Sequence, residues 1–205
     1  MSPELEQRIK RVFTNGNDDE PDKSQFVVDT GQRLQRVFDQ VQQSLPVAMS
    51  MGFSNDRSFE FVVTDSAAPK FDDWCFTMKN PDKLKWIAAN GGEPYVACWF
   101  TVSRVADYYK TWTNHWRPRG DTGYLDTSHS EEPSATWQQW QAEIARAMAG
   151  HGFVLATFEF WRERVPFVMT YGGDDVPEDD PRGSDDDFEP PPVPATLYGC
   201  LFGDQ

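Results

Sequence analysis

Apolar residues recur at helical spacing in five parts of the chain. In the first, Ser2 and Pro3 provide an N-cap and a first helical residue, and Leu5, Ile9 and Phe13 follow at every fourth position. The longest regular stripe starts after an acidic or hydroxyl cap and stops at a proline, which cannot continue a helix. The spacing predicts helices over residues 3–13, 30–45, 81–90, 103–116 and 135–150.

Other segments show the patterns that are typical of strands. Residues 47–53 and 59–63 alternate around turn-forming residues and predict a β-hairpin. Residues 95–102 are almost continuously apolar, which favours a central strand buried on both faces. Residues 153–161 and 165–171 predict a second hairpin, and shorter strands are expected over 74–78 and 197–202.

The order of these elements indicates the fold class. Hairpins imply antiparallel pairing, and the chain lacks the strand–helix–strand alternation of a doubly wound fold. We therefore expect an α+β fold, with helices packed on one face of a mixed or mainly antiparallel sheet and an acidic loop before the last strand. At 205 residues the chain is expected to form one domain, 1–205, with that loop at 172–194 and an irregular loop over 118–133.

Composition favours a packed protein outside the membrane. Aromatic residues make up 14% of the chain and supply ample apolar surface to bury. The first residues lack the basic start and apolar run of a secretory signal, and no stretch has the length of a membrane span, which predicts a cytoplasmic location and no membrane association. Cys75, Cys98 and Cys200 lie in separate apolar stretches and are predicted to be buried thiols.

The negative charge is unevenly distributed. Residues 1–171 carry a net charge of −5, whereas residues 172–205 carry −9 and contain a single basic residue, Arg182. Negative surfaces repel nucleic acids and anionic lipids and attract basic proteins. We therefore expect a protein partner of basic character, such as a toxin or effector, and no nucleic acid; the pattern does not indicate an oligomeric state.

The acidic segment, residues 174–189, is the first candidate functional site. Nine carboxylates in sixteen positions cannot enter a core, so the segment must be solvated. It serves either as a solubility loop or as an electrostatic arm for a basic partner. Phe188 lies within the charge and precedes three prolines, which favours an extended anchor. The predicted partner-binding residues here are Asp174, Asp175, Asp179, Asp180, Asp185, Asp186, Asp187, Phe188 and Glu189.

The second candidate is the polar stretch 115–129, HWRPRGDTGYLDTSH. Its histidines, arginines and aspartates are residue types that serve acid–base catalysis or anion binding. Long loops also collect polar residues without any catalytic role, so a surface loop is the simpler interpretation. If the chain is an enzyme, the predicted site is that of a hydrolase or transferase and consists of His115, Arg117, Arg119, Asp121 and His129.

Local signatures of catalysis or cofactor binding are missing from the sequence. It has no Gly-rich phosphate loop, no GxGxxG after a strand, no GxSxG and no HExxH. The carboxylates of the acidic segment lack the alternate spacing of a calcium-binding EF-hand loop. No metal ion and no cofactor is predicted, and whether the chain is an enzyme is left open.

The aromatic residues are the third feature of the sequence that bears on function. Trp116 is predicted to lie partly in the core and is also a candidate anchor for a partner. In general character, as a small acidic chain rich in aromatic residues and without a catalytic motif, the protein resembles bacterial toxin-immunity proteins. The resemblance covers no specific motif, and it implies a non-enzymatic protein that binds and neutralises a cognate toxin or effector. The alternatives are the hydrolase or transferase above and a structural subunit of a phage or secretion assembly, for which a large apolar patch is expected.

Overall fold

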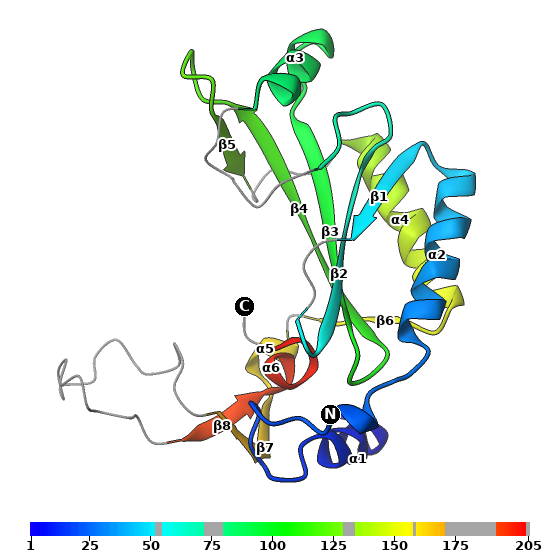
Figure 1. The fold of residues 1–205 in the computed structure, drawn as a ribbon, viewed down its shortest axis with the longest axis vertical. Coiled ribbons are helices and arrows are strands. Elements are labelled where there is room, and N and C mark those ends of the chain that lie inside the picture. Colours follow the sequence, from blue (N-terminus) through cyan, green and yellow to red (C-terminus); the bar gives the residue numbers. More distant parts are fainter. Residues whose placement is uncertain (52–54, 72–79, 129–133, 158, 171–191, 204–205) are drawn as a thin grey trace, which may run out of the picture.

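The computed structural model describes residues 1–205 except 52–54, 72–79, 129–133, 158, 171–191 and 204–205. These residues form an α+β protein with a mainly antiparallel sheet (Figure 1). The described elements are, in chain order, α1 (Pro3–Val12), the 3-10 helix η1 (Lys23–Gln25), α2 (Thr30–Ser44), β1 (Val47–Met51), β2 (Ser58–Asp65), α3 (Pro81–Ala89), β3 (Tyr95–Ser103), β4 (Tyr108–Pro118), β5 (Leu125–Ser128), α4 (Ala135–Gly150), β6 (Val154–Leu155), α5 (Glu159–Arg162), β7 (Arg164–Thr170), β8 (Val193–Thr196) and α6 (Leu197–Phe202).

Among the described residues, the main sheet has six strands in the order β1-β2-β3-β4-β5, with β6 beside β4. All neighbours are antiparallel except β4 and β6. Every residue of β3 is buried, as the continuous apolar run predicted. The hairpin predicted within residues 47–63 is confirmed by the pairing of β1 with β2, in which Met51 lies opposite Phe61.

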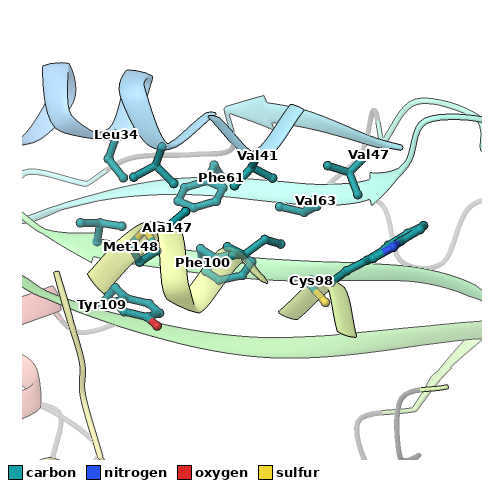
Figure 2. Close-up of a cluster of buried hydrophobic side chains, with 14 of the residues drawn as sticks. Leu34, Val41, Val47, Phe61, Val63, Cys98, Phe100, Tyr109, Ala147 and Met148 are labelled. Atoms are coloured by element: carbon teal, nitrogen blue, oxygen red, sulfur yellow. The ribbon is translucent and has the colours of Figure 1, made fainter. Parts of the chain in front are cut away.

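Helices α2 and α4 cover one face of this sheet, where the main hydrophobic core forms. Figure 2 shows Leu34 of α2 and Met148 of α4 approaching Phe61 and Phe100, which belong to β2 and β3. The rings of Phe61 and Phe100 are stacked with centroids 4.8 Å apart, and Phe38 meets Phe61 edge-on at 4.7 Å. The apolar stripes predicted for both helices are therefore the surfaces that bury this face.

A second apolar cluster joins the two ends of the chain. It contains buried Leu5 and Ile9 from α1, Val165 from β7 and Leu201 from α6. In Figure 1 these elements lie together at the end of the sheet where β3 turns into β4. The hydroxyl of Ser103, the last residue of β3, donates to the Leu201 carbonyl at 2.6 Å. We name the group of α1, β7, β8 and α6 the terminal layer.

Three of the four predicted helix caps are formed by the expected side chains, whereas Asp29 precedes α2 without a capping hydrogen bond from its side chain. Ser2, Asn80 and Ser134 each accept a hydrogen bond from the backbone N–H three residues further on. Helix α2 begins at Thr30 and ends before Pro46, again as predicted. Four of the five predicted helices are thus confirmed as α1, α2, α3 and α4.

The helix predicted over residues 103–116 is wrong, because this segment contains most of the strand β4. Tyr109 is buried on the face covered by α2 and α4, whereas Trp116 is buried in the cluster on the opposite face. A strand covered on both faces has apolar residues at adjacent positions, so some of them also fall at helical intervals. Thr111 and Thr113, which are β-branched, were the contrary signal. Within the predicted loop 118–133, β5 pairs with the end of β4.

The second predicted hairpin is also wrong. Its first half contains β6, which runs parallel to β4, and the short helix α5; its second half, β7, pairs with β8 instead. The strand predicted over 197–202 is helix α6, which Thr196 caps by accepting a hydrogen bond from Gly199 N at 2.9 Å. A short run of apolar residues suits a buried helix and a buried strand equally, so the pattern could not decide. The strand expected over 74–78 lies outside the described residues.

Candidate functional site

The two strands that bracket the acidic segment pair with each other. Thr170 of β7 lies opposite Val193 of β8, and Met169 lies opposite Pro194. The chain therefore leaves the terminal layer and returns to it at one place, with the acidic segment inserted there. The partner-binding residues predicted in that segment, from Asp174 to Glu189 and including Phe188, lie outside the described residues.

Backbone hydrogen bonds hold this strand pair to the N-terminal part of the chain. Met169 N donates to the Gly16 carbonyl at 2.7 Å, and Asp18 N donates to the Met169 carbonyl at 3.0 Å. Val165 and Ala195 bury their side chains in the terminal layer. The strands that precede and follow the acidic segment in the chain, β7 and β8, are thus packed and hydrogen-bonded.

The residues of the second predicted site occupy different environments. His115 is only 2% exposed, and its position in β4 places it on the same sheet face as Tyr109. Arg117, Arg119 and Asp121 are exposed, and Arg119 forms an ion pair with Asp126 at 3.7 Å. His129 lies outside the described residues. The enzymatic alternative stays a prediction, for which the structure provides one buried histidine and two exposed arginines.

Trp116 belongs to an apolar cluster on the face opposite α2 and α4. It is 4% exposed, and its ring centroid lies 5.7 Å from those of Tyr95 and Phe71. Ile87 of α3 is buried in the same cluster. The anchor role of Trp116 stays a prediction, and in this structure the ring is packed inside the molecule.

A row of three polar side chains crosses this same face beside α6. Glu60 of β2, Thr101 of β3 and Lys110 of β4 are direct cross-strand neighbours. The Thr101 hydroxyl donates to Oε1 of Glu60 at 3.2 Å, and Glu60 is 4% exposed. A carboxylate, a hydroxyl and an amine therefore stand side by side at the border between the sheet and the terminal layer. We name these three residues the polar row.

Aromatic rings surround the amine of the polar row. Lys110 Nζ lies 4.5 Å from the ring centroid of Tyr198 and 5.6 Å from that of Phe202, both on α6. It also lies 5.0 Å from the ring of Trp112, its neighbour on the same face of β4. The α6 rings are buried, whereas Lys110 and Trp112 are half-buried. Cation–π attraction thus helps to hold α6 on the sheet.

Burial changes the protonation of this lysine. It lowers the pKa of Lys110 from 10.5 to about 8, while the Glu60 carboxylate acts in the opposite direction. Burial has this effect because the charged form loses hydration. Near pH 8 a large share of the side chain is then a neutral amine, whereas an ordinary lysine is almost fully charged.

We expect the stability of the protein to rise between about pH 8 and pH 10.5 because of Lys110. In that range the unfolded chain binds more protons than the folded one, so raising the pH favours folding. The free energy of unfolding should increase by about 1 to 2 kcal/mol over this range. This is less than the full pKa shift would give, because Lys110 is partly exposed and solvent screens its charge. Urea unfolding of the wild type and of Lys110→Met across this range measures it. Identical pH dependence of the two proteins would contradict the expectation.

The buried cysteines differ from Lys110 in their chemistry. Cys98 and Cys200 are buried, as predicted, and Cys75 lies outside the described residues. Cys98 Sγ lies 3.2 Å from Thr113 Oγ1 and accepts a hydrogen bond from Gln141 at 3.3 Å. Burial raises the pKa of the Cys98 thiol, which therefore stays protonated and unreactive.

Sequence reasoning missed the polar row because its members are far apart in the chain. The available signal was the lysine in YYKTWTNHW, where a charge stands among aromatic residues. That lysine becomes informative only after the segment is recognised as a strand. The pairing register then places Glu60 and Lys110 on either side of Thr101.

Comparison with known proteins adds no relative. No family model, no curated protein and no solved structure matches the chain. Within the part of the chain that the structure describes, no three His, Cys, Asp or Glu side chains are grouped as a metal site requires. None of the helices in the described ranges has the length and apolar character needed to cross a membrane.

Proposed function

We propose that the protein is a non-enzymatic binding protein that recognises a basic protein partner, in the way that bacterial immunity proteins neutralise a cognate toxin or effector. The observation that carries this proposal is the concentration of negative charge. Residues 172–205 carry a net charge of −9, against −5 for the much longer part of the chain that precedes them. A localised field of this kind attracts a basic protein and speeds its association.

The attachment of the acidic segment supports the same function. The strands on either side of it in the chain, β7 and β8, pair with each other, and Val165 and Ala195 bury their side chains in the apolar cluster of the terminal layer. A charged segment inserted at one point of a packed base can meet a partner without disturbing the main core. Steering by such a segment acts mainly on the association rate and weakens as salt screens the charge.

Replacing residues 174–189 by an uncharged Gly/Ser linker of equal length tests this function. The association rate with the purified product of the neighbouring gene should fall by about tenfold or more at low ionic strength. The difference should shrink at high salt, because the lost interaction is electrostatic. Stopped-flow or surface-binding measurements at several salt concentrations give both quantities.

A matched control neutralises exposed carboxylates elsewhere. Glu4→Gln, Asp39→Asn and Asp82→Asn remove three carboxylates from three helices, and for each carboxylate removed they should alter the association rate much less than the linker does. Failure of the intact protein to form a complex at low or moderate salt would contradict the binding function. An unchanged association rate after linker replacement, with the complex retained, would reduce the acidic segment to a solubility loop.

A further inference from the structure

We infer that the outer edge of β1 binds an extended segment of a basic protein, which adds a strand to the main sheet. The inference rests on the proposed function for the basic character of the partner, and it names a second surface besides the acidic segment. Among the described residues, β1 ends the strand order of the main sheet, and it lies beside α2 (Figure 1). Recognition by strand addition uses the backbone hydrogen-bonding groups of an exposed edge of this kind.

The backbone of β1 has hydrogen-bonding groups that point away from β2. In an antiparallel ladder, residues that exchange hydrogen bonds with the neighbouring strand alternate with residues that do not. The Pro46 carbonyl, just before β1, accepts a hydrogen bond at 3.0 Å from the residue that follows β2. The register then makes Ala48 and Ser50 the next bonded residues of β1. The N–H and C=O groups of Met49 and Met51 therefore face the outer edge.

Strand β1 also lacks the features that protect an exposed edge from pairing. Such edges usually carry charged residues, proline or a bulge. The other described outer strands of four or more residues follow this rule: β5 carries the exposed Asp126, β7 contains Pro166 and an irregular register, and β8 contains Pro194. The sequence of β1, VAMSM, has neither a charge nor a proline, and its register with β2 is continuous. The edge of β1 is therefore suited to receive a strand.

Apolar side chains line this edge on the side of α2. Val47 belongs to the main core, so Met49 and Met51 point to the same side of the strand. Met49 is half-buried and Met51 is 57% exposed. Phe38 and Leu45, which pack against the same core, are also half-buried. Because methionine is unbranched and flexible, this side of the edge can adapt to apolar side chains at alternate positions of a bound strand.

The charge around β1 favours a basic segment over a second copy of the chain. Residues 37–65, which contain the second half of α2, β1 and β2, have four acidic residues and one basic residue, Arg57. Arg57 is buried and donates to two backbone carbonyls, so the charge that this region presents to solvent is negative. A second copy would meet charge of the same sign, in addition to the net charge of −14 on each chain. A lysine-rich segment would meet charge of the opposite sign.

A lysine–valine peptide tests the inference independently of any natural partner. The peptide acetyl-Lys-Val-Lys-Val-Lys-Val-Lys-amide alternates basic and apolar residues, and its glutamate–valine counterpart is the matched control. In the full-length protein, an excess of the lysine peptide should slow hydrogen exchange of the Met49 and Met51 amides by about tenfold or more, as measured by NMR. The amides of Ala48 and Ser50, which already bond to β2, should change little. Unchanged exchange at Met49 and Met51, or equal protection by the two peptides, would overturn the inference.

Two variants separate backbone pairing from charge. Met49→Pro removes an outward N–H group but no hydrogen bond to β2, so it should abolish the protection of Met51 by the lysine peptide. Urea unfolding reports whether this variant keeps its stability. Met51→Lys changes an exposed position and should bind the lysine peptide severalfold more weakly than Met51→Gln, which removes the same side chain without adding charge. Equal binding by Met51→Lys and Met51→Gln would contradict a basic partner at this edge.

Two controls distinguish this edge from a dimer contact and from the acidic segment. If the wild type sediments as a dimer and Met49→Pro as a monomer, the edge binds a second copy and the inference is wrong. Replacement of residues 174–189 by the Gly/Ser linker leaves β1 intact, so the lysine peptide should still protect Met49 and Met51 in that variant. Loss of this protection would assign peptide binding to the acidic segment instead of the edge. Failure at the edge leaves the function of the acidic segment to be decided by its own association rates.

Discussion

Phe61→Ala is expected to lower the free energy of unfolding by about 3 to 5 kcal/mol. Phe61 is fully buried, and its ring stacks on Phe100 and meets Phe38 edge-on, so truncation removes contacts on two sides at once. The cavity lies between β2 and the α2–α4 pair, where neighbouring side chains are already closely packed and can relax only in part. Urea unfolding followed by tryptophan fluorescence measures the loss.

Two companion variants sharpen this expectation. Phe61→Leu keeps most of the buried volume and should cost less than half as much as the alanine variant. Tyr124→Ala removes an aromatic ring that is 39% exposed in the turn region before β5, and it should cost well under the Phe61 value. A loss below about 1 kcal/mol for Phe61→Ala would mean that the sheet and helices do not depend on this stack.

Local chemistry explains which parts of the fold could be predicted. The starts of α1, α3 and α4 followed from Ser2, Asn80 and Ser134, since capping depends on residues a few positions apart. The central strand β3 followed from a continuous apolar run, which a sheet covered on both faces requires. These features are decided by the immediate sequence, so no tertiary information was needed.

The wrong predictions concern segments whose structure depends on how they pair or pack in the fold. Strand β7 pairs with β8 across the acidic segment, so its true neighbour is separated from it by more than twenty residues. Strand β4 packs Tyr109 into the core under α2 and α4, and it packs Trp116 with Tyr95 on the opposite face. Tertiary contacts, which periodicity does not encode, decided the structure in both cases.

The acidic segment could be recognised from the sequence alone, whereas the polar row could not. A run of carboxylates is visible in any sequence, because charge density needs no fold to be recognised. The polar row exists only through strand register, which brings Glu60, Thr101 and Lys110 together from three strands. Its unusual lysine also depends on α6, the segment that the pattern assigned to a strand. A correct prediction of this site therefore required the fold first.

Arg57→Ala is expected to destabilise the protein by about 3 to 5 kcal/mol. Arg57 is only 8% exposed, and its Nη1 donates to the Gly199 carbonyl of α6 at 2.9 Å. Its Nη2 donates to the Asp18 carbonyl, and the guanidinium lies 5.6 Å from the Phe13 ring centroid. Truncation to alanine removes the charged donors of two buried carbonyl groups. The loss of stability therefore includes the cost of leaving these carbonyls without a hydrogen bond, in addition to the two hydrogen bonds themselves.

The loss should appear first in the terminal layer, because Arg57 links the start of β2 to α6 and to the loop that carries Asp18. In hydrogen exchange, the amides of α6, β7 and β8 should lose protection in Arg57→Ala while those of α2 and α4 keep most of theirs.

Arg57→Lys should be intermediate in stability, since an ammonium cannot reproduce the two-pronged donation of a guanidinium. Arg146→Ala, at a side chain that is 70% exposed and paired with Glu143, should cost less than about 0.5 kcal/mol. If Arg57→Ala lowers the free energy of unfolding no more than Arg146→Ala does, apolar contacts alone hold the terminal layer together, and the buried guanidinium does not fix α6 in it.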